Sequence, residues 1–169
     1  MIRVTIKRTD KGFAEIVREM HALSGRAVTV GIHADAGSER AIIASTHEYG
    51  APSLRIPARP WLRPAFDENL ATNEKRVRGI VANVLRGKNA EPLLRLFGEG
   101  AQAQVRAYIE SQPASWAPLA ARTQAGREKR LGARRRPRNN RFGGHRILMD
   151  TRQHLFNFIR YELGRNNAG

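Results

Sequence analysis

A proline-rich stretch in the first half of the chain sets the strongest limit on its fold. Residues 50–66, GAPSLRIPARPWLRPAF, contain four prolines, three arginines and one tryptophan. Proline lacks a backbone donor and disfavours a helical conformation in the residue before it, so this stretch cannot be an ordinary helix or a central strand. Its apolar content is too high for a simple disordered linker. Residues 50–64 are therefore predicted to form a stiff, extended strap.

The segments around the strap alternate between strand and helix patterns. Residues 2–6, 27–32 and 158–163 are predicted strands, because their apolar side chains alternate with polar ones or are β-branched. Apolar residues at helical spacing predict a helix over 13–23 and a shorter one that ends near Gly50.

Two long helices are predicted in the centre of the chain. One runs from Pro64, a favourable first-turn proline, to about residue 86, and the other from about 91 to 109. The fold class is therefore α+β. We expect a single domain over residues 1–169, with a small antiparallel or mixed sheet packed with the two helices, the extended proline-rich arm and a basic late loop.

Positive charge is the main compositional signal. The chain carries 30 Lys and Arg against 15 Asp and Glu, a net charge of +15. Residues 122–146 alone hold ten Lys and Arg and one acid, Glu128. A patch of this kind is typical of proteins that bind nucleic acid, an acidic protein surface or anionic lipid. The dominance of arginine favours bidentate contacts to phosphate or carboxylate.

The sequence offers no constellation for catalysis, a cofactor or a metal. It has no cysteine, which excludes disulfides and thiolate metal sites and fits a reducing cytosol. His33 with Asp35, and His47 with Glu48, lack the spacing of a known ligand motif. No phosphate loop or nucleophile elbow is present. A signal peptide and a membrane span are not expected either.

The strap is predicted to be a protein interface. Its stiffness lowers the ordering penalty of docking, and Trp and Arg are the residues that most often carry interface energy. The alternative is a crossover loop that packs on its own core. The interface prediction covers Ile56, Pro57, Arg59, Pro60, Trp61, Leu62, Arg63 and Pro64.

Several blocks resemble the virion-morphogenesis family of tailed phages, which comprises neck and tail-completion proteins. The blocks are Val30-Gly31-Ile32, Glu48-Tyr49-Gly50, Ile56–Pro64, Trp116-Ala117-Pro118-Leu119 and Leu148-Met149-Asp150-Thr151. Arg152 stands where the family usually has glycine, and the arginine-rich insert is longer than that connection in the family.

The resemblance implies a non-enzymatic virion protein assembled in the cytoplasm of the bacterial host. It would form a ring, six-fold or twelve-fold, at the joint between the portal or head-closure layer and the tail. Its partners would be copies of itself and neighbouring neck, head-closure, tail-terminator or tail-tube proteins, with DNA in the channel.

Two further sets of residues are assigned roles from the sequence. Arg134, Arg135, Arg136, Arg138 and Arg141 are predicted to contact either packaged DNA or acidic residues of the next ring. Stacking aromatics are nearly absent there, which favours the protein partner. Asp150 and Thr151 are predicted helix caps.

The alternative function is a free-standing nucleic-acid-binding protein that uses residues 122–146.

Overall fold

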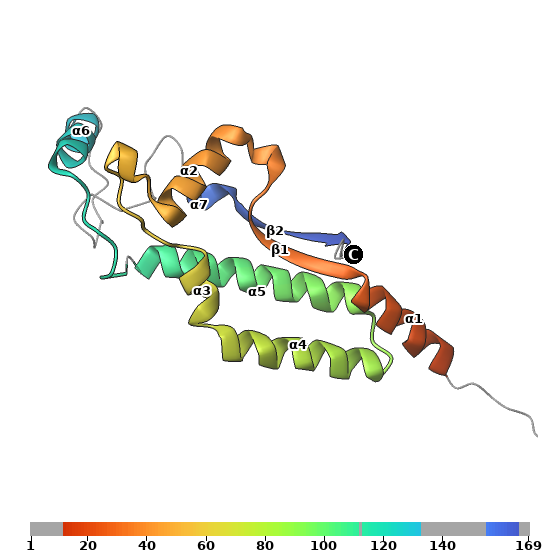
Figure 1. Cartoon of the computed structure of the whole chain (residues 1–169). Helices are drawn as coiled ribbons and strands as arrows, with labels where there is room; N and C mark the ends of the chain where they lie inside the picture. Colours follow the sequence, from red (N-terminus) through yellow and green to blue (C-terminus); the bar gives the residue numbers. More distant parts are fainter. Residues whose placement is uncertain (1–11, 112, 133–154, 166–169) are drawn as a thin grey trace, which may run out of the picture. The chain divides into compact units, whose positions relative to one another are not determined.

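The computed structural model describes residues 12–111, 113–132 and 155–165. The chain begins with α1 (Phe13–Ser24), β1 (Arg26–Ile32), the short helix η1 (Ala34–Ala36) and α2 (Ser38–Tyr49). The strap region contains η2 (Pro52–Leu54) and α3 (Arg63–Asp67). Then follow α4 (Leu70–Leu85), α5 (Ala90–Ser111), α6 (Ala121–Gly132), α7 (Leu155–Phe158) and β2 (Ile159–Arg165) (Figure 1). The described helices include none that is both long and apolar enough to span a bilayer.

The α+β fold class is confirmed, because helices accompany a two-stranded antiparallel sheet of β1 and β2. Both strands lie where the sequence predicts them. Along β2 the buried Ile159 alternates with the exposed Arg160 and Glu162, as the sequence pattern requires. The predicted strand at residues 2–6 lies outside the described residues.

The long helix predicted from Pro64 to residue 86 is two helices in the structure. The helix that starts with Pro64 in its first turn ends at Asp67, and α4 begins at Leu70. Asn69 marks the break: its side-chain amide donates to the Ala65 carbonyl at 2.9 Å, and its backbone N–H donates to Phe66 at 3.1 Å. An asparagine side chain competes in this way with the regular backbone hydrogen bonds of a helix.

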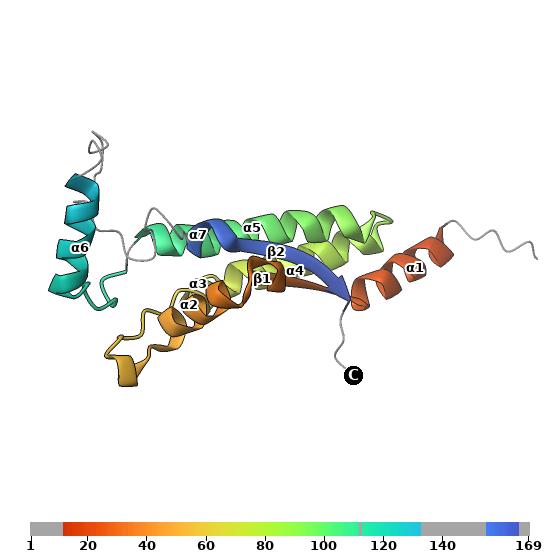
Figure 2. The same ribbon diagram turned by 90° about the horizontal axis from the view of Figure 1, so that it is seen from above.

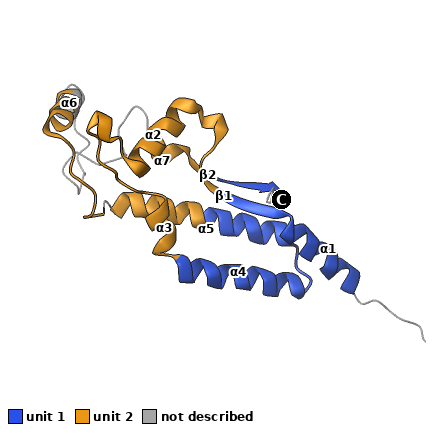
Figure 3. Cartoon of the chain, in the orientation of Figure 1, with its two compact units in different colours: residues 1–29, 70–100, 161–169 blue, residues 30–69, 101–160 orange. Residues whose placement is uncertain are grey.

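The chain divides into two compact units, each built from separate parts of the sequence (Figure 3). Unit 1 comprises residues 1–29, 70–100 and 161–169, and unit 2 comprises residues 30–69 and 101–160. Each has its own apolar core. The single-domain assignment stays a prediction.

Unit 1 packs α1, α4 and the first half of α5 with parts of both strands. Its buried residues are Ile80, Val84, Ala90 and Leu94, with Met20, Leu23, Val28, Leu93, Phe97 and Leu163 packed against them. Gly98 allows Tyr161 of β2 to lie directly on α5, since an added Cβ would come within 2.3 Å of that ring. The glycine therefore has a packing role inside the helix.

Unit 2 packs part of the strap with α2, α3 and the second half of α5. The buried members of its core are Ala44, Trp61, Ala65, Val105, Ile109, Trp116, Leu155 and Ile159. Two of them, Trp61 and Trp116, come from segments that contain no regular helix or strand. The strap therefore contributes Trp61 to the core of unit 2.

Candidate functional site

The first part of the strap is a closed loop. Ala51 and Ile56 pair as an antiparallel bridge, with N–H to carbonyl distances of 2.9 and 3.0 Å. Between them lies η2, and Arg55 adopts a left-handed conformation with φ 54°. The prediction of an extended backbone is therefore wrong for residues 51–56, which form a loop. Residues 57–61 of the strap contain no helix, bridge or turn.

Arg59 holds the middle of the strap to a distant segment of unit 2. Its Nε and Nη2 atoms donate to the carbonyls of Ala117 and Pro118 at 2.8 and 2.9 Å. Its backbone N–H donates to the His47 carbonyl at 2.7 Å. The residue is only 4% exposed. A buried guanidinium requires such acceptors, so these contacts fix the strap in one position.

Two tryptophans lock the end of the strap into the core of unit 2. Trp61 is 2% exposed, and its indole N–H donates to the Ala44 carbonyl at 3.2 Å. The indole N–H of Trp116 donates to the Pro60 carbonyl at 2.9 Å. Trp116 also makes an edge-on contact with Tyr108, with the ring centroids 6.1 Å apart. Both indole donors are satisfied, as buried tryptophans require.

These contacts revise the interface prediction for two residues. Trp61 and Arg59 are buried in their own chain, so neither is available to a neighbouring subunit without leaving this core. The alternative, a crossover loop packed on its own core, describes them better. Pro57 and Arg63 are exposed, and Ile56, Pro60, Leu62 and Pro64 are partly buried. For these members the interface role stays a prediction.

Glu48 of α2 caps α3 from a distance. Its carboxylate accepts hydrogen bonds from the backbone N–H groups of Trp61, Leu62 and Arg63 at 2.8, 2.9 and 3.1 Å. These donors belong to the N-terminal end of α3, where the helix dipole also favours a negative charge. One carboxylate therefore sets where the strap ends and the helix begins.

Replacing Glu48 with alanine should lower the free energy of unfolding by about 2 kcal/mol, because three backbone N–H groups, two of them in partly buried hydrogen bonds, lose a charged acceptor. Urea denaturation of the purified chain measures this. Glu110→Ala is the control, because it removes an exposed carboxylate from the surface of α5 and should change stability by less than about 0.5 kcal/mol. Equal effects of the two substitutions would contradict the capping role.

Several titratable groups of unit 2 interact with neighbouring residues. Burial, followed by the negative charge of Glu68, raises the pKa of Tyr108. A side-chain hydrogen bond from Arg160 lowers the pKa of Asp35. His33 Nε2 lies 3.1 Å from the Arg160 carbonyl oxygen. Within the described parts of the chain, no group of three His, Asp or Glu side chains is placed to hold a metal ion.

Some predicted site residues lie outside the described residues. They are Arg134, Arg135, Arg136, Arg138, Arg141, Asp150 and Thr151. Their predicted contacts with DNA or an acidic partner, and their predicted capping role, stay predictions.

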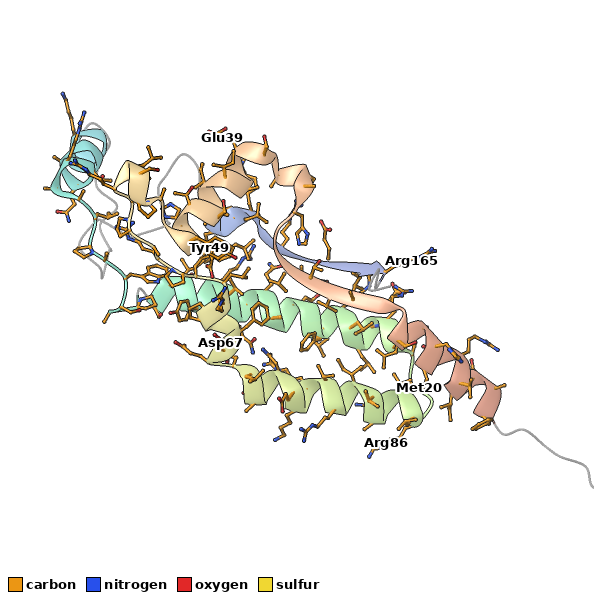
Figure 4. All side chains as sticks on the ribbon, viewed as in Figure 1. Met20, Glu39, Tyr49, Asp67, Arg86 and Arg165 are labelled. Carbon is orange, nitrogen blue, oxygen red and sulfur yellow. The ribbon has the colours of Figure 1, made fainter. Side chains whose placement is uncertain are left out.

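Two exposed apolar residues lie at or beside the loop, and the sequence analysis predicted a contact role for neither of them. Tyr49 at the end of α2 is 69% exposed and Leu54 in η2 is 70% exposed (Figure 4 labels Tyr49). The sequence pattern did not distinguish them, because neither belongs to a periodic apolar face. Glu48 was missed as a cap because it lies 13 residues before the first backbone N–H that donates to it, that of Trp61.

No protein-family model, curated protein or solved structure matches this chain.

Proposed function

We propose that this chain is a structural, non-enzymatic protein of a tailed-phage virion. It would form part of the neck or tail-completion ring that joins the portal or head-closure layer to the tail. Its partners are copies of itself and the neighbouring rings. The proposal starts from the resemblance of five sequence blocks to the virion-morphogenesis family.

One observation supports the proposal more than any other. Three of the five blocks bind one another directly in unit 2. Glu48 accepts from the Ile56–Pro64 block, and Arg59 of that block donates to the carbonyls of Ala117 and Pro118. Trp116 completes the set through the Pro60 carbonyl. Residues shared with a family are expected to form one structural unit if the resemblance reflects a common fold.

The anchored strap presents a rigid tip. Arg59, Trp61 and Glu48 hold its base, while Leu54 and Arg55 are exposed at its end. A tip that is ordered before binding loses little conformational entropy when it docks. Such a surface suits a protein that must assemble repeatedly with the same neighbours.

The nucleic-acid alternative is favoured by the charge of residues 122–146. In the described part of that segment, Arg122 and Lys129 of α6 are exposed. Two results would together favour this alternative. The purified chain would bind duplex DNA with a steep salt dependence, and it would be missing from virions.

Deleting the gene should yield heads and tails that do not join, and particles that carry the chain should show density for it at the neck. Electron microscopy and mass spectrometry of purified particles measure both. Tailed particles that join normally without the chain would refute the proposal.

Leu54→Asp should reduce the yield of joined particles by about tenfold or more, since a charge on an apolar contact residue removes hot-spot energy. Its melting temperature should stay unchanged, because Leu54 is 70% exposed. Ser53→Asp is the matched control, with the same charge added at an adjacent exposed position. Normal joining with Leu54→Asp would exclude the tip as a contact.

A further inference from the structure

Arg55 adopts a backbone conformation that an arginine disfavours. Its φ of 54° and ψ of 34° lie in the left-handed region, and among the described residues it is the only one other than glycine with a positive φ. The Cβ atom crowds the backbone in this conformation, so glycine would form the same turn at a lower free energy. Strain of this kind persists where the surrounding structure imposes it, and it is concentrated at functional sites.

The loop that carries Arg55 is held in that shape by backbone hydrogen bonds. The bridge between Ala51 and Ile56 closes the loop, and the Arg55 N–H donates to the Pro52 carbonyl at 2.9 Å. In both views the loop between α2 and α3 projects away from the second half of α5 (Figures 1 and 2). The fold therefore imposes the strain on Arg55 and exposes the residue.

The Arg55 side chain makes no contact that would explain the strain. It is exposed, and its guanidinium takes part in no hydrogen bond or ion pair with the described residues. The neighbouring charged residues differ, because Glu48 accepts three backbone N–H groups and Arg59 donates to two carbonyls. Residues 50–58 contain no other charged residue. The loop therefore presents a single cation that is available to a partner.

An exposed apolar side chain accompanies this cation. Leu54 is 70% exposed, and Arg55 follows it directly in the chain. A nucleic-acid backbone is bound through several cations at once, whereas this loop offers one. Arginine beside an apolar residue is instead typical of protein interfaces, where the planar guanidinium pairs with a carboxylate through two hydrogen bonds. The matching surface is an apolar pocket with an aspartate or glutamate at its edge.

Two cavities of unit 1 do not match that surface. The smaller, of about 110 Å³, contains Glu19 and Glu91. Both carboxylates are engaged, because Glu19 accepts from the first N–H of α5 at 2.9 Å and Glu91 pairs with two arginines. The larger cavity, of about 450 Å³, is lined by Arg76 and by no acidic residue. These cavities favour a receptor on a different protein over a second copy of this chain.

We propose that Leu54 and Arg55 dock into an apolar pocket, edged by a carboxylate, on a different protein of the neighbouring rings. The inference rests on the proposed function and names the chemistry of the surface that receives the tip. The strained turn is already formed before the partner binds, so docking does not require the loop to become ordered. A second copy of the chain and packaged DNA are the competing occupants.

Two substitutions separate the strain at Arg55 from its guanidinium. Arg55→Gly removes both, so the melting temperature should rise by about 2 °C while the yield of joined particles falls about tenfold or more. Arg55→Gln keeps the strain and removes the charge, so the yield should fall equally at an unchanged melting temperature. Arg86→Gln is the control, because Arg86 is also exposed and forms no ion pair among the described residues; it should change neither quantity.

Normal joining with Arg55→Gln would overturn the inference. A lower melting temperature of Arg55→Gln would also overturn it, because the guanidinium would then stabilise the chain's own fold. A residue that served only the fold would not be expected to give a more stable chain that fails to join, which is the result expected for Arg55→Gly.

Cross-linking in purified particles identifies the partner. The chain has no cysteine, so Ser53→Cys provides a single attachment point beside the tip for a thiol-reactive photo-cross-linker. The expected product is a link to a different protein, in a peptide that contains Asp or Glu. Replacing that acidic residue with arginine should restore joining to chain that carries Arg55→Glu. A link to a second copy or to packaged DNA would overturn the inference.

The same particles separate this inference from the proposed function. Normal joining with Arg55→Gln, in particles that contain the chain, would refute the proposed receptor and leave the virion role intact. Wild-type chain that is missing from particles would refute the virion role, and with it the inference that rests on that role.

Discussion

Trp61→Ala should lower the free energy of unfolding of the isolated chain by about 3–5 kcal/mol, as expected for truncating a buried aromatic side chain. Trp61 is 2% exposed and packs in the core of unit 2 with Ala44, Ala65 and Val105. The substitution removes these apolar contacts and leaves the Ala44 carbonyl without its indole donor. Urea denaturation followed by circular dichroism measures the loss.

Trp61→Phe is the matched control for this prediction. It keeps most of the apolar volume and removes only the indole N–H, so it should be less destabilising, by about 1–2 kcal/mol. A Trp61→Ala chain with wild-type stability that fails to enter particles would instead place Trp61 at a subunit interface. The experiment therefore decides between the two roles that the strap's sequence leaves open.

Gly50→Ala should destabilise the chain by about 3 kcal/mol or more, for two separate reasons. Gly50 has φ 77° and ψ 172°, a conformation that is essentially restricted to glycine and strains other residues by about 1–3 kcal/mol. An added Cβ would also lie 2.8 Å from the Ala58 nitrogen and 3.1 Å from the Ile56 oxygen. Both contacts are with backbone atoms, so neither is relieved by a side-chain rotation.

Gly87→Ala is the comparison variant, with a positive φ and no close approach. Gly87 has a similar φ of 82°, but a Cβ there would meet no atom within 4 Å. Its substitution should be destabilising by about 1 kcal/mol, from backbone strain alone. The difference between the two variants in urea denaturation measures the close approach of the strap at Gly50 together with the greater backbone strain at that position. Equal losses would show that the strap can move away from this position.

The segments that the sequence predicted well are those with local periodicity. Residues 13–23 and 91–109 were predicted as helices, and 27–32 and 158–163 as strands, because the spacing of apolar side chains along a few turns or pleats specifies the element. The break at Asn69 was missed, since a single side-chain hydrogen bond to Ala65 decides it without changing the apolar period.

The sequence by itself determined that residues 50–64 could be neither ordinary helix nor central strand, because proline restricts its own and its neighbour's backbone. Only the tertiary structure showed that Arg59 and Trp61 of that segment pack against their own chain. Trp61 meets Ala44, 17 residues earlier, and Arg59 meets Ala117, 58 residues later. Contacts at such separations depend on how the helices pack, so they cannot be predicted from a short stretch of sequence. The same long-range packing turns the predicted interface anchor, Trp61, into part of the chain's own core.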